Sequence, residues 1–308
     1  GHELWRWTFP VNKLNQQTEQ LSPLSSRPTY TETENDLTVK ANKRTFIFSK
    51  KDGQLKGVSV DNRKISFANG PRFIGARRAD RSLDQFYNHD DEKAKEKDRT
   101  YSEFPDAAVF TKLDVKQDGG DLIVTANYKL GNLDKAQWTI NPSGDLALDY
   151  TYNFSGVVDL MGIRFDYPED QVISKRWLGA GPYRVWQNRI HGTQYDVWEN
   201  DYNDPIPGET FTYPEFKGYF GDVSWMNIQT KEGTISLTNE TPDTYIGVYQ
   251  PRDGRDRLLY TLPESGISVL NVIPPVRNKV NSTDLCGPSS QPKWVNGPQT
   301  GRVIFRFM

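Results

Sequence analysis

Residues 44–60, RTFIFSKKDGQLKGVSV, decide the fold of this chain. Phe46 and Phe48 alternate with other residues before the turn at Lys51-Asp52-Gly53, and a second alternating run starts at Leu55. An Asp-Gly turn between two runs of period two is the strongest short-range signal for a β-hairpin. The stretch therefore predicts two antiparallel strands joined by a tight turn.

The same signal recurs along the chain. A second hairpin is predicted over residues 107–128, around Asp118-Gly119-Gly120, and a third over 138–154, around Asn141-Pro142-Ser143-Gly144. Later strands are predicted at residues 162–165, 223–229, 234–238, 245–249, 267–272 and 302–307. Helical periodicity is confined to a short candidate at 79–87. Many short strands without long helices predict an all-β fold of packed antiparallel sheets.

The composition excludes several classes of protein. The 308 residues include 38 Lys and Arg against 40 Asp and Glu, and a net charge of −2 offers no basic surface for nucleic acid. Apolar runs are far shorter than the ~20 residues of a membrane span. The single cysteine, Cys286, excludes an internal disulfide and a cysteine-based zinc site. We therefore expect a globular protein with neither a nucleic-acid nor a membrane partner.

The first 34 residues differ in character from the rest. Residues 4–10 alternate as one strand, whereas residues 11–34 are polar and rich in Ser, Thr, Gln and Pro, as linkers are. We interpret residues 1–10 as the end of a preceding β domain, 11–34 as a linker and 35–308 as one β domain. The residues after Gly1 lack the basic start and apolar core of an export signal, which we expect further upstream.

Aromatic residues concentrate in residues 177–225. Twelve of these 49 residues are aromatic, and they include four of the eight tryptophans. Pyranose rings present flat C–H faces to aromatic planes, while Arg, Asn, Asp and Glu hydrogen-bond the hydroxyl rim. This chemistry predicts a carbohydrate-binding site on a loop shaped by Gly179, Gly181 and Pro182. Its candidate residues are Trp177, Tyr183, Arg184, Trp186, Asn188, Arg189 and Trp198.

The alternative is that these rings only fill the core between the sheets. Trp186 and Trp198 have polar neighbours, so they are the two rings that we expect at the surface.

Catalytic and metal-binding residues are not nominated. Asn239-Glu240 has the form of the acid-bearing pair of many barrel glycosidases, but no barrel pattern surrounds it. A glycosidase needs two carboxylates flanking the scissile bond, and the sequence singles out no such pair. His89 and His191 are isolated, as surface or packing histidines usually are. Five acids could ligate calcium, but their spacing fits no ion-binding loop, so no cofactor is expected: Asp80, Asp84, Asp90, Asp91 and Glu92.

Five stretches of the chain resemble the last domain of family 2 β-galactosidases: 46–55 (FIFSKKDGQL), 69–71 (NGP), 77–81 (RRADR), 161–164 (MGIR) and 177–189 (WLGAGPYRVWQNR). They occur in the family's order, and the last is similar to the signature Trp-x-Gly-x-Gly-Pro-x-Glu-Asn-Tyr-x-Asp-Arg. The resemblance implies the large antiparallel β-supersandwich shared with galactose mutarotases. Residues 1–10 would then end an immunoglobulin-like domain.

The resemblance also implies that catalysis and part of the sugar contact belong to different domains. In that family the two catalytic glutamates belong to a central TIM barrel, and the last domain packs against the barrel and lends an aromatic residue to the sugar pocket. Trp294 is the comparable residue here. Residues 183–186, YRVW, replace the family's Glu-Asn-Tyr stretch, which indicates a branch that acts on another sugar or on a branched plant polysaccharide.

Three functions remain open at this point. The first is an accessory, non-catalytic domain of a family 2-like glycoside hydrolase, partnered by the catalytic barrel of the same polypeptide and by a galactoside or plant-polysaccharide-derived carbohydrate. The second is an aldose epimerase-like enzyme on the same fold, which needs a His acid facing a carboxylate base. The third is a purely structural interface domain. Because polysaccharide-degrading enzymes usually work outside the cytoplasm, we expect a periplasmic or extracellular location.

Overall fold

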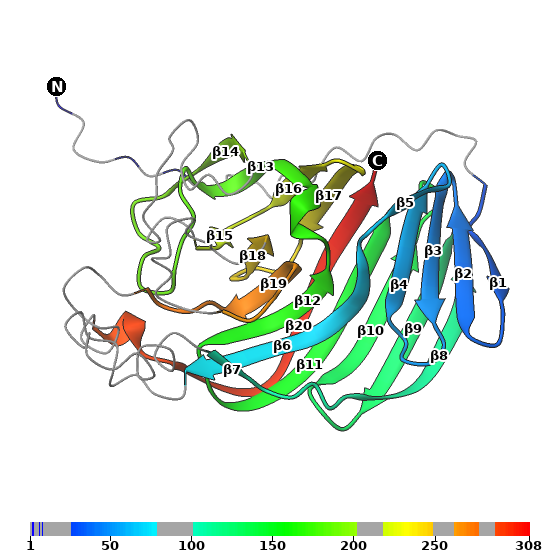
Figure 1. The fold of residues 1–308 in the computed structure, drawn as a ribbon, viewed down its shortest axis with the longest axis horizontal. Coiled ribbons are helices and arrows are strands. Elements are labelled where there is room, and N and C mark those ends of the chain that lie inside the picture. The colour runs from blue at the N-terminus through cyan, green and yellow to red at the C-terminus, as the bar shows by residue number, and fades with distance from the viewer. Residues whose placement is uncertain are drawn as a thin grey trace.

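The computed structural model describes residues 26–78, 101–201, 218–248, 262–276 and 287–308, together with His2, Arg6 and Thr8. Two antiparallel sheets pack face to face as a sandwich (Figure 1). The helical elements within these ranges are two 3₁₀ turns, η1 (Glu169–Gln171) and η4 (Pro288–Ser290). The predicted all-β sandwich is confirmed, and the helix predicted at 79–87 lies outside the described residues.

The first sheet has eleven strands in the described part of the chain. Its main path is β1 (Thr29–Glu32), β2 (Asp36–Ala41), β3 (Arg44–Ser49), β4 (Leu55–Val60), β6 (Ala68–Arg78), β12 (Leu160–Asp166), β19 (Ile267–Val272), β18 (Tyr245–Val248) and β15 (Phe220–Gly221). Two short strands pair beside this path, β5 (Arg63–Ile65) with β4 and β7 (Tyr101–Glu103) with β6. β1 falls within the stretch predicted as a linker, so that boundary is corrected: the sheet begins at Thr29 rather than at residue 35.

The second sheet has nine strands among the same residues. Its order is β14 (Gln194–Asp201), β13 (Val172–Gly181), β16 (Trp225–Thr230), β17 (Gly233–Asn239), β20 (Lys293–Phe307), β11 (Leu146–Val158), β10 (Leu133–Ile140), β9 (Asp121–Lys129) and β8 (Val109–Asp118). The long strands β11 and β20 pair along 13 residues and curve beneath β6 in Figure 1.

The three predicted hairpins are confirmed as β3–β4, β8–β9 and β10–β11. The turn of the first requires its glycine for two reasons. Gly53 has a φ of +74°, which side chains rarely adopt, and a Cβ there would lie 2.7 Å from the ring of Phe110 in the other sheet. The same residue that permits the turn therefore also lets the two sheets approach.

An aromatic cluster fills the core between the sheets. The Phe165 ring in β12 stacks on Phe67 with ring centroids 4.7 Å apart, and it meets Phe305 of β20 edge-on at 5.3 Å. Trp138 of β10 approaches the same ring at 6.1 Å. All four side chains are fully buried. Burial of such rings stabilises a fold by roughly 1.5–3 kcal/mol each, so this cluster holds the two sheets together.

A second cluster covers the outer face of the first sheet. Phe73 of β6 points into the core between the sheets, and its neighbour Ile74 points the opposite way, because successive side chains of a strand alternate. Ile74 packs there with Val185, Trp186 and Tyr219. The middle strands of the first sheet are therefore buried on both faces at this end of the molecule.

An ion pair ties the β10–β11 turn to the last strand. Asp145 accepts hydrogen bonds from Arg306 Nε at 2.7 Å and Nη2 at 2.8 Å, and both side chains are largely buried. Burial alone would raise the pKa of Asp145, but the hydrogen bonds and charge of Arg306 outweigh it and hold the pKa below its usual value. The pair thus contributes stability at neutral pH.

Replacing Asp145 with asparagine is expected to lower the free energy of unfolding at neutral pH by about 3 kcal/mol, because Arg306 loses its buried counter-charge. The folded-state pKa is lowered, so this stability is present above the unfolded pKa of about 3.9 and is lost as the pH falls through the folded pKa. Urea unfolding at neutral and at acidic pH measures the difference between the variant and the native chain, which should shrink in acid.

The matched control for this prediction is Asp114→Asn. Asp114 pairs with Lys112 at 2.8 Å on the surface, with more than half of each side chain exposed, so its loss should cost less than about 0.5 kcal/mol. Equal effects of the two variants, or a difference that persists unchanged in acid, would contradict the role given to Asp145.

Candidate functional site

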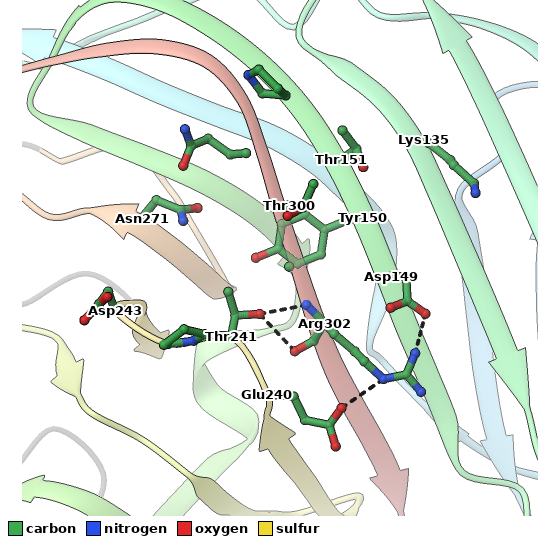
Figure 2. A pocket seen from close by; sticks show the side chains of 14 residues that line it. Lys135, Asp149, Tyr150, Thr151, Glu240, Thr241, Asp243, Asn271, Thr300 and Arg302 are labelled. Atoms are coloured by element: carbon green, nitrogen blue, oxygen red, sulfur yellow. Dashed lines mark hydrogen bonds and ion pairs between the residues drawn. The ribbon is translucent and has the colours of Figure 1, made fainter.

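A polar groove runs along the free edge of β20. Within the described residues, β17 pairs with this strand only from Val303 to Phe307, so the edge from Lys293 to Arg302 has no neighbouring strand. The turn that follows β17 crosses beside this edge (Figure 2). The space between them is a groove of about 790 Å³. We call it the β20 groove.

The lining of the β20 groove is rich in hydroxyl, amide and charged side chains. It comes from β10, β11, β19, β20 and the β17–β18 turn, and its residues are Lys135, Asp149, Tyr150, Thr151, Glu240, Thr241, Pro242, Asp243, Asn271, Pro298, Gln299, Thr300, Gly301 and Arg302. Tyr150 is the only aromatic residue among them, and it is 2% exposed. The groove can therefore offer many hydrogen bonds but little flat apolar surface.

Arg302 organises the charges of the groove. Its guanidinium pairs with Asp149 of the adjacent strand and, at 2.9 Å from Nε, with Glu240 of the turn (Figure 2). Burial works against the charge of Arg302, but Asp149 and then Glu240 outweigh it and raise its pKa above the usual value. Both carboxylates are thereby held in fixed positions on one wall.

The backbone of Arg302 is also bound by the turn. Its N–H donates to the Thr241 hydroxyl at 2.7 Å, and the same hydroxyl donates to its carbonyl oxygen at 3.1 Å. Both backbone groups of Arg302 therefore point to the free edge. Alternation along the strand directs those of Thr300 to the same edge, whereas Pro298, two residues further, has no N–H to offer. This proline blunts the edge against pairing with another strand.

A packed floor lies beneath the polar wall. Tyr150 stands directly opposite Gly301, and a Cβ at Gly301 would lie 2.3 Å from the Tyr150 hydroxyl oxygen, so the glycine makes room for the ring. Next to it, the Tyr152 hydroxyl donates to Asn271 Oδ1 at 2.6 Å and joins the two sheets. The groove is thus built on rigid strands, as a preformed binding site requires.

The structure locates the most buried residues of the predicted aromatic site in the core. Trp177 lies on β13, meets Phe220 edge-on at 4.8 Å and donates from Nε1 to the Ala180 carbonyl at 3.0 Å. Arg184 is 1% exposed, with its guanidinium 5.8 Å from the same Phe220 ring. Trp186, which we expected at the surface, is 2% exposed, and that expectation is wrong. These three side chains offer no face to a ligand in this arrangement.

Residues 182–189 connect distant segments instead. Asn188 donates from Nδ2 to the Val276 carbonyl at 2.7 Å and accepts from the Val276 N–H at 2.9 Å. Its neighbour Gln187 donates to the carbonyl oxygens of Ser289 and Gln291, both at 2.7 Å. The polar side chains that suggested contacts with sugar hydroxyls therefore bind two other segments of the chain, one after β19 and one just before β20.

The other members of the predicted site are partly exposed. The Tyr183 hydroxyl donates to the His191 carbonyl at 3.0 Å, and Arg189 bridges to Trp186 through the backbone. Trp198 donates from Nε1 to the Gln194 carbonyl at 3.2 Å. Residues 177–181, predicted as part of a loop, form the end of β13 instead. A sugar-binding role for Tyr183, Asn188, Arg189 and Trp198 stays a prediction.

Trp294 is 72% exposed, on β20 opposite Val157. It is not among the residues of the groove, although it lies four residues from Pro298 on the same strand and, by alternation, on the same face. His89, Cys286 and the five acids considered for calcium lie outside the described residues. In the described ranges, no group of three or more His, Cys, Asp or Glu side chains is placed to hold a metal ion.

These features define a two-sheet β-sandwich with a polar groove along a strand edge. Comparison with family models gives one match, described as β-galactosidase small chain, over residues 40–274. Because the match covers more than half of the sequence, the chain belongs to the β-galactosidase small chain family. The resemblance drawn from the five stretches is confirmed. A comparison with curated protein sequences found no match.

Solved structures similar to this chain include three of low identity. Galactose 1-epimerase from Lactobacillus acidophilus NCFM is 9% identical, with a TM-score of 0.46 over 92% of this chain and 99% of that one. The GalM/aldose epimerase homologue from C. elegans is 7% identical, with a TM-score of 0.36 over 91% of this chain and 99% of that one. Aspergillus nidulans amine oxidase is 8% identical, with a TM-score of 0.35 over 100% of this chain and 56% of that one. These scores lie below 0.5, so the fold rests on the sheets described above.

The described part of the chain contains no helix with the length and hydropathy of a membrane span.

Proposed function

We propose that this chain is an accessory, non-catalytic domain of a β-galactosidase-like glycoside hydrolase and that it contacts carbohydrate through the β20 groove. The observation that carries the proposal is the occurrence of this polar groove in a member of the β-galactosidase small chain family. The catalytic carboxylates would then belong to the catalytic part of the enzyme, which is the partner of this domain.

The side chains of the groove suit the hydroxyl groups of a sugar. Asp149 and Glu240 supply carboxylate acceptors, Thr300 a hydroxyl, and Lys135 an exposed ammonium group. Charged acceptors form the stronger hydrogen bonds with hydroxyl donors. Because the groove has little flat apolar surface, we propose Trp294 as the aromatic contact that lies beside it on the same strand.

The two carboxylates are less suited to catalysis. Glycoside hydrolysis requires one carboxylic acid to protonate the leaving oxygen while a second carboxylate attacks or activates water. Asp149 and Glu240 share one guanidinium as their partner, which is the arrangement of an ion-pair network that stabilises structure. This geometry supports a binding role for the groove.

Sugar affinity tests the proposal. We expect galactose, arabinose, rhamnose or a pectic oligosaccharide to bind with millimolar affinity, roughly 4 kcal/mol, because a shallow contact must repay hydroxyl desolvation. Glu240→Gln should weaken binding about tenfold, since it removes a charged acceptor without changing its shape. Chemical-shift titration over a millimolar range measures both values.

Two controls belong to this titration. Glu199→Gln changes an exposed carboxylate on β14, away from the groove, and should leave the affinity unchanged. Trp294→Ala should weaken binding, whereas Tyr30→Ala, which removes an exposed ring on β1, should not. If sugar binding is saturable and its affinity is unchanged in both Glu240→Gln and Trp294→Ala, the sugar binds elsewhere and the groove is rejected.

A purely structural role is the second candidate, and one observation favours it. Trp177, Arg184 and Trp186, the centre of the 177–189 motif, are packed inside the protein. A domain whose motif serves only packing would show no shift changes with any of the four carbohydrates at tens of millimolar. That outcome would leave the family membership intact and remove the carbohydrate contact.

A further inference from the structure

The edge strand β14 carries a contact that the proposed function does not use. β14 is the first strand of the second sheet, so one of its edges has no neighbouring strand within the described residues (Figure 1). The backbone N–H of Tyr195 points to this edge and donates to the Thr8 hydroxyl at 2.6 Å. Thr8 is 187 residues away in sequence. A residue from the start of the chain therefore meets an unpaired strand edge.

The neighbouring edge amide is bound differently. Val197, two residues further on β14, donates its N–H to the carboxylate of Asp196 at 2.7 Å. Amides two residues apart on a strand point to the same edge, so two successive edge donors are both bound by side-chain oxygens. One oxygen is local to the strand and the other comes from Thr8. An unpaired edge is a template for aggregation, and bound amides reduce that tendency.

Charge also favours this contact. β14 carries three acids, Asp196, Glu199 and Asp201, and no base. Arg6 precedes Thr8 by two residues in the sequence, so the anchoring hydroxyl has a base close to it along the chain. A base near the anchoring hydroxyl is complementary in charge to this acidic strand.

We propose that the β14 edge is the docking surface for the N-terminal segment of this same chain, anchored by the Thr8 hydroxyl on the Tyr195 amide. The dock involves none of the residues that line the β20 groove. It connects Thr8 to the strand that holds Trp198, whose ring lies against Gly181 at the end of β13.

Amide hydrogen exchange at single-residue resolution on the full chain tests the dock. Thr8→Val keeps the shape of the side chain but removes the acceptor, and it should speed exchange of the Tyr195 amide at least tenfold. Thr8→Ser keeps the hydroxyl and should preserve the slow exchange. The Val197 amide, bound by Asp196, is the internal reference and should not change in either variant.

Equal exchange of the Tyr195 amide in the native chain, Thr8→Val and Thr8→Ser would overturn the proposal. A fold defect is separated from loss of the dock by the core amides, for example that of Phe165. If those amides also exchange faster in Thr8→Val, the loss is global, and a local dock at β14 is rejected.

Discussion

Replacing Trp186 with alanine is expected to lower the free energy of unfolding by about 4 kcal/mol, because the ring is 2% exposed and truncation leaves a large cavity. Trp186 meets Tyr219 edge-on at 5.8 Å and belongs to the cluster that covers the outer face of the first sheet. The adjacent Val185 exchanges two backbone hydrogen bonds with Tyr219, both 2.8 Å long. Loss of the ring therefore loosens the whole cluster on the outer face of the first sheet.

Denaturant unfolding monitored by circular dichroism measures this effect, and Trp294→Ala is its matched control. Trp294 is 72% exposed, so its removal should change the free energy of unfolding by less than about 0.5 kcal/mol. The two tryptophans thus have opposite roles: one stabilises the fold and the other is free to contact a ligand. A stable Trp186→Ala variant with an altered sugar affinity would contradict this division and restore Trp186 to the binding site.

Replacing Phe165 with alanine is expected to cost a similar amount, about 4 kcal/mol, for a different reason. Phe165 contacts rings from both sheets, stacking on Phe67 and meeting Trp138 and Phe305 at their edges. It also packs against Gly70, where a Cβ would lie 2.2 Å from the Phe165 ring. The cavity would open at the contact between the sheets, where strands from four parts of the chain meet and little relaxation is available.

A conservative variant separates packing from other effects of this change. Phe165→Leu keeps most of the apolar volume and should recover about half of the lost stability. Both variants should keep the native denaturant dependence if unfolding remains two-state. Losses of less than about 1 kcal/mol for Phe165→Ala would mean that the two sheets do not depend on this cluster.

The hairpins were predictable because their signals are local. The turn glycine Gly53 and the alternating residues on either side lie within a few positions of one another, and the strand period fixes which of them face the core. The antiparallel sandwich follows from several such units. The order of the strands does not follow from them, since β20 pairs with β17 and with β11 through contacts between residues far apart in the sequence, about half of the chain apart in the case of β11.

The expected exposure of Trp186 was wrong for a physical reason. Trp186 is surrounded in sequence by Arg184, Gln187 and Asn188, a pattern typical of an exposed ring. In the fold Gln187 and Asn188 bind backbone groups of remote segments, as Asn188 does with Val276, so their polarity in the sequence reports hydrogen bonding rather than exposure. A segment whose polar side chains hold remote backbone groups can have the same composition as a ligand-binding loop.

The β20 groove was not predictable, because it depends on register. Asp149 lies opposite Arg302 only because β11 and β20 pair in one particular alignment, and a shift of β20 by one residue would turn Arg302 to the other face, away from Asp149. Glu240 was noticed for its position after Asn239, but its partner is 62 residues away. Only the free edge left some signal, in the Gly-Pro pair at residues 297–298, which is unusual within a long strand.

Turnover is the measurement that tests the central claim most directly. The claim is that this domain contacts carbohydrate for a catalytic part that holds the reacting carboxylates. The account predicts that the chain alone does not hydrolyse chromogenic aryl β-galactosides or arabinosides, and that hydrolysis appears when the same chain is joined to its catalytic part. Hydrolysis by the chain alone that disappears in both Asp149→Asn and Glu240→Gln would contradict the account and make the β20 groove an active site.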